Sequence, residues 1–544
     1  MNKKIMLTLA ATTAIASTCM AAVKSLRVVA NEADKANPGW ENAYVGIADA
    51  VAALNAHGSS STVMNQILVA PGTYSITETL TVPWAWTCIR SAKFESDDEE
   101  DRESTIFDGG GTTSIMNITQ HHVFLSGLTF ANGFKNSESY TVGSAAVRMG
   151  NYGTISNCVF RGNVSTNVYG TCIYSGYAPG TQIVGCIFTN NSQTITISGK
   201  GVDGCAIWNR RDVPTVSGDW GLVKDCLFDG NMAEGESAMG SMLRLDYTII
   251  SGCTVLTNSF KHTSTGKEVH GGYAHLVACR IDDSYFSCIA VDSSANHAVG
   301  SVLKVTGTGS SISNCTFAGI SDRTSTRRQG TICVEGASTS IVGCRFIGND
   351  VYQGSGFVMQ KSYKDLLIRN CIFSANTTYG SGCSLIKQNA CKNGMGVRIE
   401  NCTFADNSNG YSSDANEFTI GYMNSCSSLT NFFVNNVFME PVKTASGITT
   451  VVSNCCLTAL LDGPDDANNF TIEDVGGDLK FVDAANGDYR LQTKSPLYNK
   501  GTLLDWMTAD AVDIEGNTRV FNGIPDIGCY ECQLFPPGML LIIR

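Results

Sequence analysis

The 544-residue chain is poor in proline, histidine and charge. It has 11 prolines and 7 histidines, 16% of its residues are charged, and 37 lysines and arginines stand against 49 aspartates and glutamates. The net charge of −12 disfavours nucleic acid and anionic lipid as partners, because both attract basic surfaces. Beyond the N-terminal segment no apolar run is long enough for a membrane-spanning helix, so the mature chain is not expected to cross a membrane in that way.

The N-terminal segment is the exception to this lack of apolar runs. Residues 1–22 begin with two lysines within the first few positions, continue in an apolar stretch and end in small residues. This order is typical of a secretory signal peptide. We expect cleavage after Ala21 or Ala22, with a lipoprotein cut before Cys19 as the alternative. The mature protein is therefore predicted to be exported.

Cysteine, by contrast, is abundant, and nine of the 22 cysteines recur in the pattern Asn-Cys-x-Phe or a close variant. Successive copies lie 26 to 40 residues apart, which indicates one supersecondary unit repeated with insertions. In a late copy Asn436 takes the Cys place. The cysteines of the series are Cys158, Cys186, Cys226, Cys253, Cys279, Cys315, Cys344, Cys371 and Cys402.

Two further marks repeat with the cysteines. About half a repeat upstream stands a Gly, a small residue and a short apolar stretch, as at Gly170, Gly240 and Gly300. Three residues after the Phe place stands an Asn, which tolerates a left-handed corner and can bond its equivalents in stacked coils. These residues are Asn163, Asn191, Asn231, Asn258, Asn349, Asn376 and Asn407.

The repeat predicts an all-β parallel β-helix of about a dozen coils. Its stretches are too short for helices and rich in β-branched and aromatic residues, so each unit holds short strands whose equivalent side chains stack about 4.8 Å apart. A helix is expected over 42–54, with Ala43, Ile47, Val51 and Leu54 on one face, as a cap over the N-terminal end of the solenoid.

The cysteines are expected to be core residues. An exported chain with so many would ordinarily suggest disulfides, and some cross-links between strands stay an alternative, but one repeat phase indicates buried thiols. A metal site is disfavoured. Cys455-Cys456 and Cys529-x-x-Cys532 are placed outside the ladder, where we expect packing or a local bridge.

The segment Val69-Ala-Pro-Gly-Thr-Tyr74 resembles the first coil of the pectate-lyase-like superfamily of right-handed parallel β-helices. The resemblance covers the coils to about residue 440 and implies the right-handed sense. The Phe-x-x-Asn and Gly-small-apolar marks are also similar to the repeats of polymorphic outer-membrane proteins, which are surface adhesins, although the second Gly of those repeats is usually Ser, Thr or Cys here.

The C-terminal part resembles a second family. The stretches 513–519 (Asp-Ile-Glu-Gly-Asn-Thr-Arg) and 526–531 (Asp-Ile-Gly-Cys-Tyr-Glu) are similar to the choice-of-anchor Q domain of bacterial surface β-helix proteins, which implies architecture and no chemistry. We therefore divide the chain into a signal peptide, a cap, the β-helix, a small C-terminal β module and a tail that is either a short anchor signal or a last strand. The ranges are 1–22, 23–62, 63–440, 441–534 and 535–544.

No complete catalytic set stands out. Polygalacturonases carry Asn-Thr-Asp, Gly-His-Gly and Arg-Ile-Lys, none of which occurs here. The best candidate cluster is Asp282 and Asp283 with Lys267 and His270 one strand earlier, since cleavage of a polyuronate needs acids and a base. The alternative is a solvated turn at a coil corner.

A binding stripe is a second candidate. Counting four residues from each Gly of the Gly-small-apolar mark places Tyr174, Trp208, Arg244 and Lys304 in one outward row, with Val147 and Val334 in line and Arg210 beside it. Aromatic and basic groups in one row suit an acidic glycan, and an ordinary mixed surface is the alternative.

The acidic run from Glu95 to Glu103 could attract calcium, but its spacing is not that of a calcium loop, and a solvated loop is expected instead. We expect no cofactor. The chain is predicted to be a monomeric, exported bacterial surface or secreted protein, adhesin-like or glycan-binding, with a polysaccharide or a host or cell-surface glycan as partner. The alternative is a polysaccharide lyase or glycoside hydrolase acting on acidic polysaccharide.

Overall fold

The computed structural model describes residues 24–54, 63–93 and 102–534, with short internal gaps. The expected signal peptide with Cys19, the tail from residue 535, most of the acidic run and Lys267 lie outside the described residues. No helix in the described ranges is long and apolar enough to cross a membrane. The gaps are 177, 211–218, 264–267, 288, 294–296, 323–327, 337, 353–356, 362–364, 380–383, 390, 410–417, 423–425, 443–446 and 462–467.

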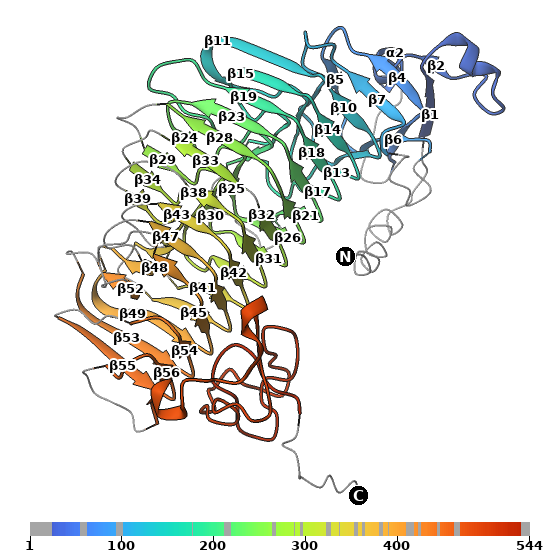
Figure 1. The fold of residues 1–544 in the computed structure, drawn as a ribbon. Coiled ribbons are helices and arrows are strands. Elements are labelled where there is room, and N and C mark those ends of the chain that lie inside the picture. Colours follow the sequence, from blue (N-terminus) through green and yellow to red (C-terminus); the bar gives the residue numbers. More distant parts are fainter. Residues whose placement is uncertain are drawn as a thin grey trace, which may run out of the picture. The chain divides into compact units, whose positions relative to one another are not determined.

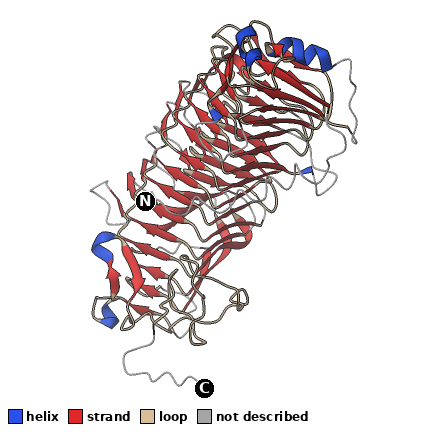
Figure 2. Ribbon diagram, turned by 90° about the vertical axis from the view of Figure 1, so that its right-hand side faces the viewer, coloured by secondary structure: helices blue, strands red, loops and turns tan. Residues whose placement is uncertain are grey.

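The chain forms two compact units. Unit 1 runs to Thr194 and includes Cys205–Asn231, and unit 2 holds Ile195–Gly204 and everything from Met232 onward. In each unit the strands of every long sheet pair in parallel with their equivalents in the coils before and after (Figure 1). This confirms the predicted fold class, an all-β, right-handed parallel β-helix. Figure 2 shows how little of the described chain is helical.

Unit 1 contains four parallel sheets, which we number in the order in which one coil visits them. The first sheet has the order β2 (Tyr44–Val45), β1 (Lys24–Val29), β3 (Asn65–Val69), β6 (Thr87–Ser91), β9 (Val123–Ser126), β13 (Thr154–Ser156), β17 (Gln182–Val184) and β21 (Gly221–Lys224). The second has the order β4 (Gly72–Ser75), β7 (Thr105–Asp108), β10 (Thr129–Ala131), β14 (Val159–Arg161), β18 (Ile187–Thr189) and β22 (Leu227–Asp229). The third consists of β11 (Phe134–Val142), β15 (Val164–Tyr169) and β19 (Ser192–Thr194). The fourth consists of β5 (Leu80–Val82), β8 (Met116–Ile118), β12 (Val147–Arg148), β16 (Ile173–Tyr174) and β20 (Ile207–Asn209).

Unit 2 repeats this arrangement. Its first sheet has the order β26 (Thr248–Ser251), β31 (Arg280–Asp282), β36 (Ser311–Ser313), β41 (Thr339–Val342), β45 (Leu366–Arg369), β49 (Lys392–Glu400), β53 (Ser427–Val434) and β55 (Ile448–Ser453). Its second has the order β27 (Thr254–Val255), β32 (Tyr285–Ser287), β37 (Thr316–Ala318), β42 (Arg345–Ile347), β46 (Ile372–Ser374), β50 (Thr403–Ala405), β54 (Val437–Phe438), β56 (Cys456–Leu457) and β57 (Phe470–Thr471).

The third sheet of unit 2 consists of β23 (Met232–Gly235), β28 (Ser259–His262), β33 (Ala290–Ser293), β38 (Ser321–Asp322), β43 (Asp350–Tyr352), β47 (Thr377–Tyr379) and β51 (Ser408–Asn409). The fourth consists of β25 (Leu243–Asp246), β30 (Ala274–Val277), β35 (Leu303–Thr306), β40 (Ile332–Val334), β44 (Val358–Gln360), β48 (Ser384–Gln388) and β52 (Phe418–Tyr422). An additional small sheet consists of β24 (Ala238–Met239), β29 (Glu268–His270), β34 (His297–Val299) and β39 (Arg328–Gln329).

Stacked aromatic rings fill the interior beside the second sheet. In unit 1 the rings of Phe130, Phe160, Phe188 and Phe228 follow one another with centroids 4.8 to 5.2 Å apart. In unit 2 the centroid distances are 4.4 to 5.2 Å. Coils about 4.8 Å apart impose this spacing, so the predicted Phe ladder is confirmed. The rings of unit 2 are Phe286, Phe317, Phe346, Phe373, Phe404 and Phe438.

The predicted Asn ladder is confirmed in two stretches. Asn163 donates from Nδ2 to Asn191 Oδ1 at 2.9 Å, and Asn191 to Asn231 at 2.8 Å. In unit 2 Asn349, Asn376 and Asn407 repeat this arrangement. Between Asn258 and that second stretch, the pairing of the third-sheet strands puts Ile289 and Ile320 in the ladder position, and both are buried.

The left-handed corner does not lie at the ladder Asn, as the sequence suggested, but one residue earlier. Gly162, Asn190, Gly230 and Ala375 have φ between 53° and 66°, while their ladder neighbours have ordinary φ values. The side chain of the ladder Asn points into the coil and bonds its equivalents, and the preceding residue turns the chain. A second left-handed corner precedes the Cys place, for example at Asn157 with φ 50°.

Two cysteine assignments are corrected by the strand pairing. Tyr285 pairs with Thr254 and Thr316, so Ser284 occupies the Cys place and bonds the Cys253 amide at 3.1 Å. Cys279 lies one corner earlier in the coil. With Ser284 in the Cys place, the distance in sequence is 31 residues from Cys253 to Ser284 and 31 residues from Ser284 to Cys315. Cys455, which the sequence placed outside the ladder, belongs to it.

The late end of the ladder is ordered by similar contacts. Asn436 takes the Cys place as predicted: its Oδ1 accepts from the Cys402 amide at 2.8 Å, and its own amide contacts Cys455 Sγ at 3.3 Å. None of the nineteen described cysteines forms a disulfide, and all but Cys88 and Cys426 are buried. Burial raises the pKa of Cys455 to about 12, so the thiol stays protonated and acts as packing.

The expected cap helix is present but shorter than predicted. Helix α2 (Ile47–Ala53) follows β2, which pairs with β1, and Gly46 between them has φ 80°. Short 3-10 turns are η2 (Glu32–Ala36), η5 (Glu473–Val475) and η6 (Ala484–Asn486). The predicted apolar face is buried, and the helix contacts the first strands of the solenoid. The buried residues of the helix are Ile47, Ala50 and Val51, and Ala43 and Leu54 on either side of it are buried too.

The C-terminal part of unit 2 is mostly irregular. It holds one antiparallel hairpin, β58 (Phe481–Asp483) with β59 (Asp488–Leu491), and packs Leu491, Leu497 and Ile527 against Val437 and Cys456 of the second sheet. We call residues 478–534 the C-terminal module. The sequence predicted a small β module here, and the division of the chain into domains stays a prediction.

Candidate functional site

The described members of the predicted catalytic cluster, Asp282, Asp283 and His270, lie on different elements. Asp282 ends β31 in the first sheet, and Asp283 forms a left-handed corner with φ 48° whose carboxylate accepts from Asn314 at 3.2 Å. His270 belongs to β29 of the additional small sheet. The structure therefore gives Asp282 and Asp283 the position of a coil corner, which is the alternative that the sequence left open.

The predicted glycan stripe is not an outward surface. Tyr174, Trp208, Arg244 and Lys304 are 4 to 6% exposed, and the rings of Tyr174 and Trp208 stack on each other at 4.8 Å. In unit 1 Tyr174 pairs with Trp208. In unit 2 Arg244 pairs with His275, and His275 pairs with Lys304 in the next coil. Strand alternation places these residues on one face but does not tell whether that face is exposed. Arg210 is exposed and belongs to no such row.

The counting from Gly was also off by one at two positions. Val147 pairs with Ile173 and Val334 with Val305, so Arg148 and Cys333 stand in the row instead. Both valines are buried in the core.

Lys304 of the stripe belongs to a partly buried ionic cluster in unit 2, whereas Arg244 lies 3.7 Å from the Asp246 carboxylate. Lys304 Nζ lies 3.1 Å from His270 Nδ1 and 3.0 Å from the Glu335 carboxylate, which also pairs with Lys361 at 2.9 Å. Although burial acts in the opposite direction, hydrogen bonds from Lys361 and Lys304 hold the pKa of Glu335 below its usual value. The structure thus unites His270 and Lys304, but in a compensated ion cluster.

An open groove lies elsewhere, on the outward face of the first sheet of unit 2. Its volume is about 490 Å³, and its walls are strands β41, β45, β49 and β53 together with residues 504–506 of the C-terminal module. This is a size that accommodates a small ligand or part of a chain molecule. We call it the first-sheet groove.

Strand alternation puts the polar side chains of the groove on its floor. Leu367, Arg398 and Phe432 stand in one outward row, since Leu367 pairs with Arg398 and Arg398 with Phe432. Arg369 and Glu400 form the neighbouring row. Ile368 and Ile399 lie between the two rows, point inward and are buried.

A shared carboxylate fixes the two arginines of the groove. Glu400 is 1% exposed and accepts from Arg369 Nε at 2.7 Å and from Arg398 Nε on its other oxygen. Arg369 also lies over the ring of Trp506 at 4.6 Å, and Arg398 over that of Phe432 at 5.9 Å. Arg398 keeps 45% of its side chain exposed, so the groove presents guanidinium N–H groups in fixed positions.

Trp506 contributes a further unused donor. Its indole Nε1 is buried and has no hydrogen-bond partner, while the residue as a whole is partly exposed at the groove wall. A buried N–H without an acceptor is unfavourable by about 1 to 3 kcal/mol. The groove therefore combines aromatic rings, oriented donors and open space.

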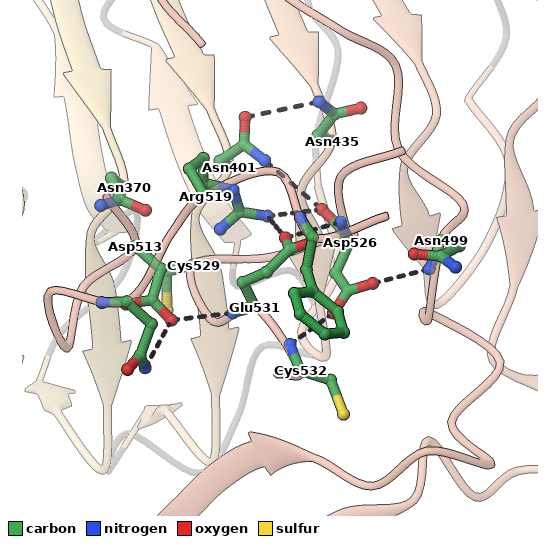
Figure 3. Close-up of polar contacts among 12 residues, drawn as sticks. Asn370, Asn401, Asn435, Asn499, Asp513, Arg519, Asp526, Cys529, Glu531 and Cys532 are labelled. Atoms are coloured by element: carbon green, nitrogen blue, oxygen red, sulfur yellow. Dashed lines mark hydrogen bonds and ion pairs between the residues drawn. The ribbon is translucent and has the colours of Figure 1, made fainter. Parts of the chain in front are cut away.

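A second polar cluster, by contrast, is sealed (Figure 3). Arg519 is 0% exposed, pairs with the Glu531 carboxylate at 3.1 Å and donates to the Asp526 carbonyl at 2.7 Å. The Asp526 carboxylate accepts from the amides of Asn499 and Cys532 at 2.6 and 2.7 Å. Burial raises the pKa of Glu531 to about 8 and that of Asp526 to about 6. We call this the sealed cluster.

The sealed cluster explains the C-terminal sequence pattern in structural terms. Asp513 accepts from the amides of Glu515, Asn517 and Glu531, so it fixes the turn at the start of the pattern to its end. The Cys529 amide donates to Thr403 Oγ1 of the solenoid at 3.1 Å. These residues order the C-terminal module.

Asn side chains at four successive corners fasten this module to the solenoid. Asn370, Asn401, Asn435 and Asn454 each precede the Cys place, have φ between 51° and 57°, and donate from Nδ2 to carbonyl groups of the module. The Asn435 contact is double, with both the carbonyl and the amide of Thr502 at 2.8 Å. Asn435 also donates to Asn401 Oδ1 at 3.4 Å (Figure 3). We call this row the Asn rail.

The groove was missed by the sequence analysis. A signal existed: Glu400 and Arg398 stand two and four residues before Cys402, and Arg369 two before Cys371, whereas Ser311 and Ser313 hold these places before Cys315. The positions two and four residues before the Cys place therefore identify outward residues of the first sheet, and Arg369, Arg398 and Glu400 are the charged ones in these coils. No pattern marked Trp506, because its contact with Arg369 spans a long stretch of irregular chain.

No protein-family model and no curated protein sequence matches the chain. Among solved structures, pectate lyase Pel9A aligns at 13% identity over 95% of this chain and 98% of its own, with a TM-score of 0.31. The A-module of mannuronan C-5 epimerase AlgE6 from Azotobacter vinelandii aligns at 14% identity over 78% and 94%, with a TM-score of 0.31. DFA-IIIase from Arthrobacter chlorophenolicus A6 aligns at 9% identity over 78% and 97%, with a TM-score of 0.37. At these TM-scores the similarity carries no argument about the function of this chain.

Proposed function

We propose that the protein is an exported saccharide-binding protein and that the first-sheet groove holds the saccharide. The observation that carries the proposal is the arrangement of Arg369, Arg398 and Glu400 beside Trp506 in an open cavity of about 490 Å³. Planar polar groups bond sugar hydroxyls in fixed directions, and an indole ring offers an apolar face to the C–H side of a sugar ring.

The rigidity of the groove supports this function. The floor is made of paired strands, and Glu400 holds both guanidinium groups, so little side-chain entropy is lost when a ligand binds. Export is part of the proposal because it rests on the N-terminal sequence, which lies outside the described residues. An adhesin-like role at the cell surface would use the same binding chemistry.

The enzymatic alternative, a polysaccharide lyase or glycoside hydrolase, stays a prediction. It needs an acid and a base within reach of one substrate, and the structure places Asp282 and His270 in different sheets, with Asp283 at the corner after Asp282. The same samples can test it, by following the release of reducing ends and of unsaturated products from neutral and acidic polysaccharides.

The test is calorimetric titration of the full mature chain with hexasaccharides of defined composition. At least one should bind, and Trp506→Ala should weaken that binding by about tenfold or more, which corresponds to about 1.4 kcal/mol. The matched control is Arg161→Gln, which removes a surface arginine paired with Glu103 at 2.8 Å in unit 1 and should leave binding unchanged. Equal binding by the wild type and Trp506→Ala would exclude the groove.

A further inference from the structure

The charge of the first-sheet groove bears on which saccharide it accepts. Among the described lining residues the charged ones are Arg369, Arg398, Asp365, Glu400 and Asp505. Two positive and three negative groups leave the groove with a net charge of −1. No lysine or histidine belongs to this described lining.

The two positive charges are already used. Both guanidinium groups share the Glu400 carboxylate, and both lie over aromatic rings. Glu400, which is 1% exposed, already compensates much of this positive charge, so a ligand carboxylate gains less attraction here than it would at an unpaired arginine. The guanidinium N–H groups that do not bond Glu400 can donate to hydroxyl oxygens, which need no net positive charge.

The remaining acids oppose a second negative charge. Asp365 and Asp505 line the groove and are partly or fully exposed, so a uronate carboxylate placed between them would meet like charges. Hydroxyl groups, by contrast, can donate to both carboxylates. The whole chain adds to this preference, because a net charge of −12 repels a polyanion at long range.

Resting on the proposed function, we infer that the first-sheet groove selects neutral oligosaccharides and rejects uronates. The preference is opposite to the acidic glycan that the sequence suggested, because the basic stripe behind that expectation is buried and the open groove is not basic. Asp365 and Asp505 are the residues that set the selectivity, and Trp506 supplies affinity without regard to charge.

The experiment titrates the full mature chain with cellohexaose, xylohexaose and maltohexaose, and with hexagalacturonate and hexaguluronate. EDTA is present throughout, so that no divalent cation can bridge carboxylates. The best neutral ligand should bind about tenfold or more tightly than either uronate. In the double variant Asp365→Asn with Asp505→Asn the ratio of neutral to uronate affinity should shrink to about threefold or less, whatever the change in the absolute affinity for the neutral ligand.

The outcomes separate the inference from the proposed function. Uronates that bind as tightly as neutral sugars, with both weakened by Trp506→Ala, would overturn the inference and leave the groove as the binding site. A double variant with an unchanged ratio would also overturn it. Absence of binding by every oligosaccharide would overturn the proposed function and the inference together.

Discussion

Two arginine and carboxylate clusters lie where the C-terminal module meets the solenoid of unit 2, and they differ in access. Arg519 and Glu531 of the sealed cluster are 0% exposed at the side chain, and backbone amides occupy the carboxylates around them. Arg398 of the groove keeps 45% of its side chain exposed although it pairs with an equally buried glutamate. The same pairing of arginine with a carboxylate therefore orders the C-terminal module in the sealed cluster and leaves donors open to solvent in the first-sheet groove.

The difference shows why residue types alone do not reveal a site. The sealed cluster contains the most regular sequence pattern of the C-terminal region, with Asp513, Arg519, Asp526 and Glu531. Charged residues in such a pattern would suggest catalysis, but every carboxylate is held by amides and closed off. The groove has no comparable pattern, and its residues come from strands and a distant loop.

The largest effect is expected from Arg519→Met. Above about pH 8, where the Glu531 carboxyl group is charged, removing the guanidinium leaves it buried without its positive partner, so we expect a loss of about 3 to 5 kcal/mol in the free energy of unfolding at such a pH. Denaturant unfolding measures it. Arg490→Ala is the matched control, since it removes an exposed arginine paired with Asp488 and should leave stability unchanged. A loss of about 1 kcal/mol or less for Arg519→Met would contradict the structural role that distinguishes the sealed cluster from the groove.

A pH dependence follows from the sealed cluster. Burial raises the pKa of Glu531 from 4.5 to about 8 and that of Asp526 from 3.8 to about 6, so folding takes up protons. The associated stability is fully present below the unfolded pKa values and is lost as pH rises through the folded ones. The unfolding temperature should fall between about pH 5 and about pH 8, and Glu531→Gln should reduce the fall. A rise over this range would contradict the assignment.

The Asn rail permits a paired test. Asn435→Ala removes two hydrogen bonds to Thr502 at a left-handed corner with φ 57°, whereas Asn314→Ala acts at an equivalent corner with φ 51° whose amide bonds the exposed Asp283. Backbone strain is similar in both, so the difference isolates docking of the module. We expect Asn435→Ala to lose about 1 to 3 kcal/mol more. Equal losses in denaturant unfolding would show that the rail does not hold the module.

The smallest stability effect is expected in the groove. Arg398→Gln removes an exposed guanidinium and leaves Glu400 paired with Arg369 at 2.7 Å, so the unfolding free energy should change by about 1 kcal/mol or less. Saccharide binding should fall several-fold, because an oriented donor is lost. A large loss of stability with unchanged saccharide binding would show that Arg398 has a structural role, like Arg519 in the sealed cluster, and not a binding role.

The interior of the solenoid could be predicted from the sequence because it repeats. Phe and Asn recur at one phase, and coil stacking translates that phase directly into ladders. The assignment of Cys279 was wrong because Ala278-Cys279-Arg280-Ile281 is similar to the repeat motif but lies one corner before it. The Cys place of that coil is occupied by Ser284, whose surroundings do not match the motif. A local pattern therefore fixes the repeat but not always its phase.

The outside of the solenoid could not be predicted in the same way. Strand alternation correctly separates inward from outward residues, but whether Arg244 or Arg398 is open depends on what covers the face. Arg244 is 5% exposed although it was expected to face solvent. Trp506 reaches Arg369 from a loop far along the chain, and no short-range pattern carries that contact.

Hydrogen exchange of the full mature chain, with and without a saturating neutral hexasaccharide, tests the central claim most directly. Protection on binding should concentrate in β45, β49 and β53 and in residues 504–506, with no change in 513–531 of the sealed cluster or in β25, β30 and β35 around the buried basic row. Protection that appears in those segments, while the groove strands exchange as before, would contradict the account.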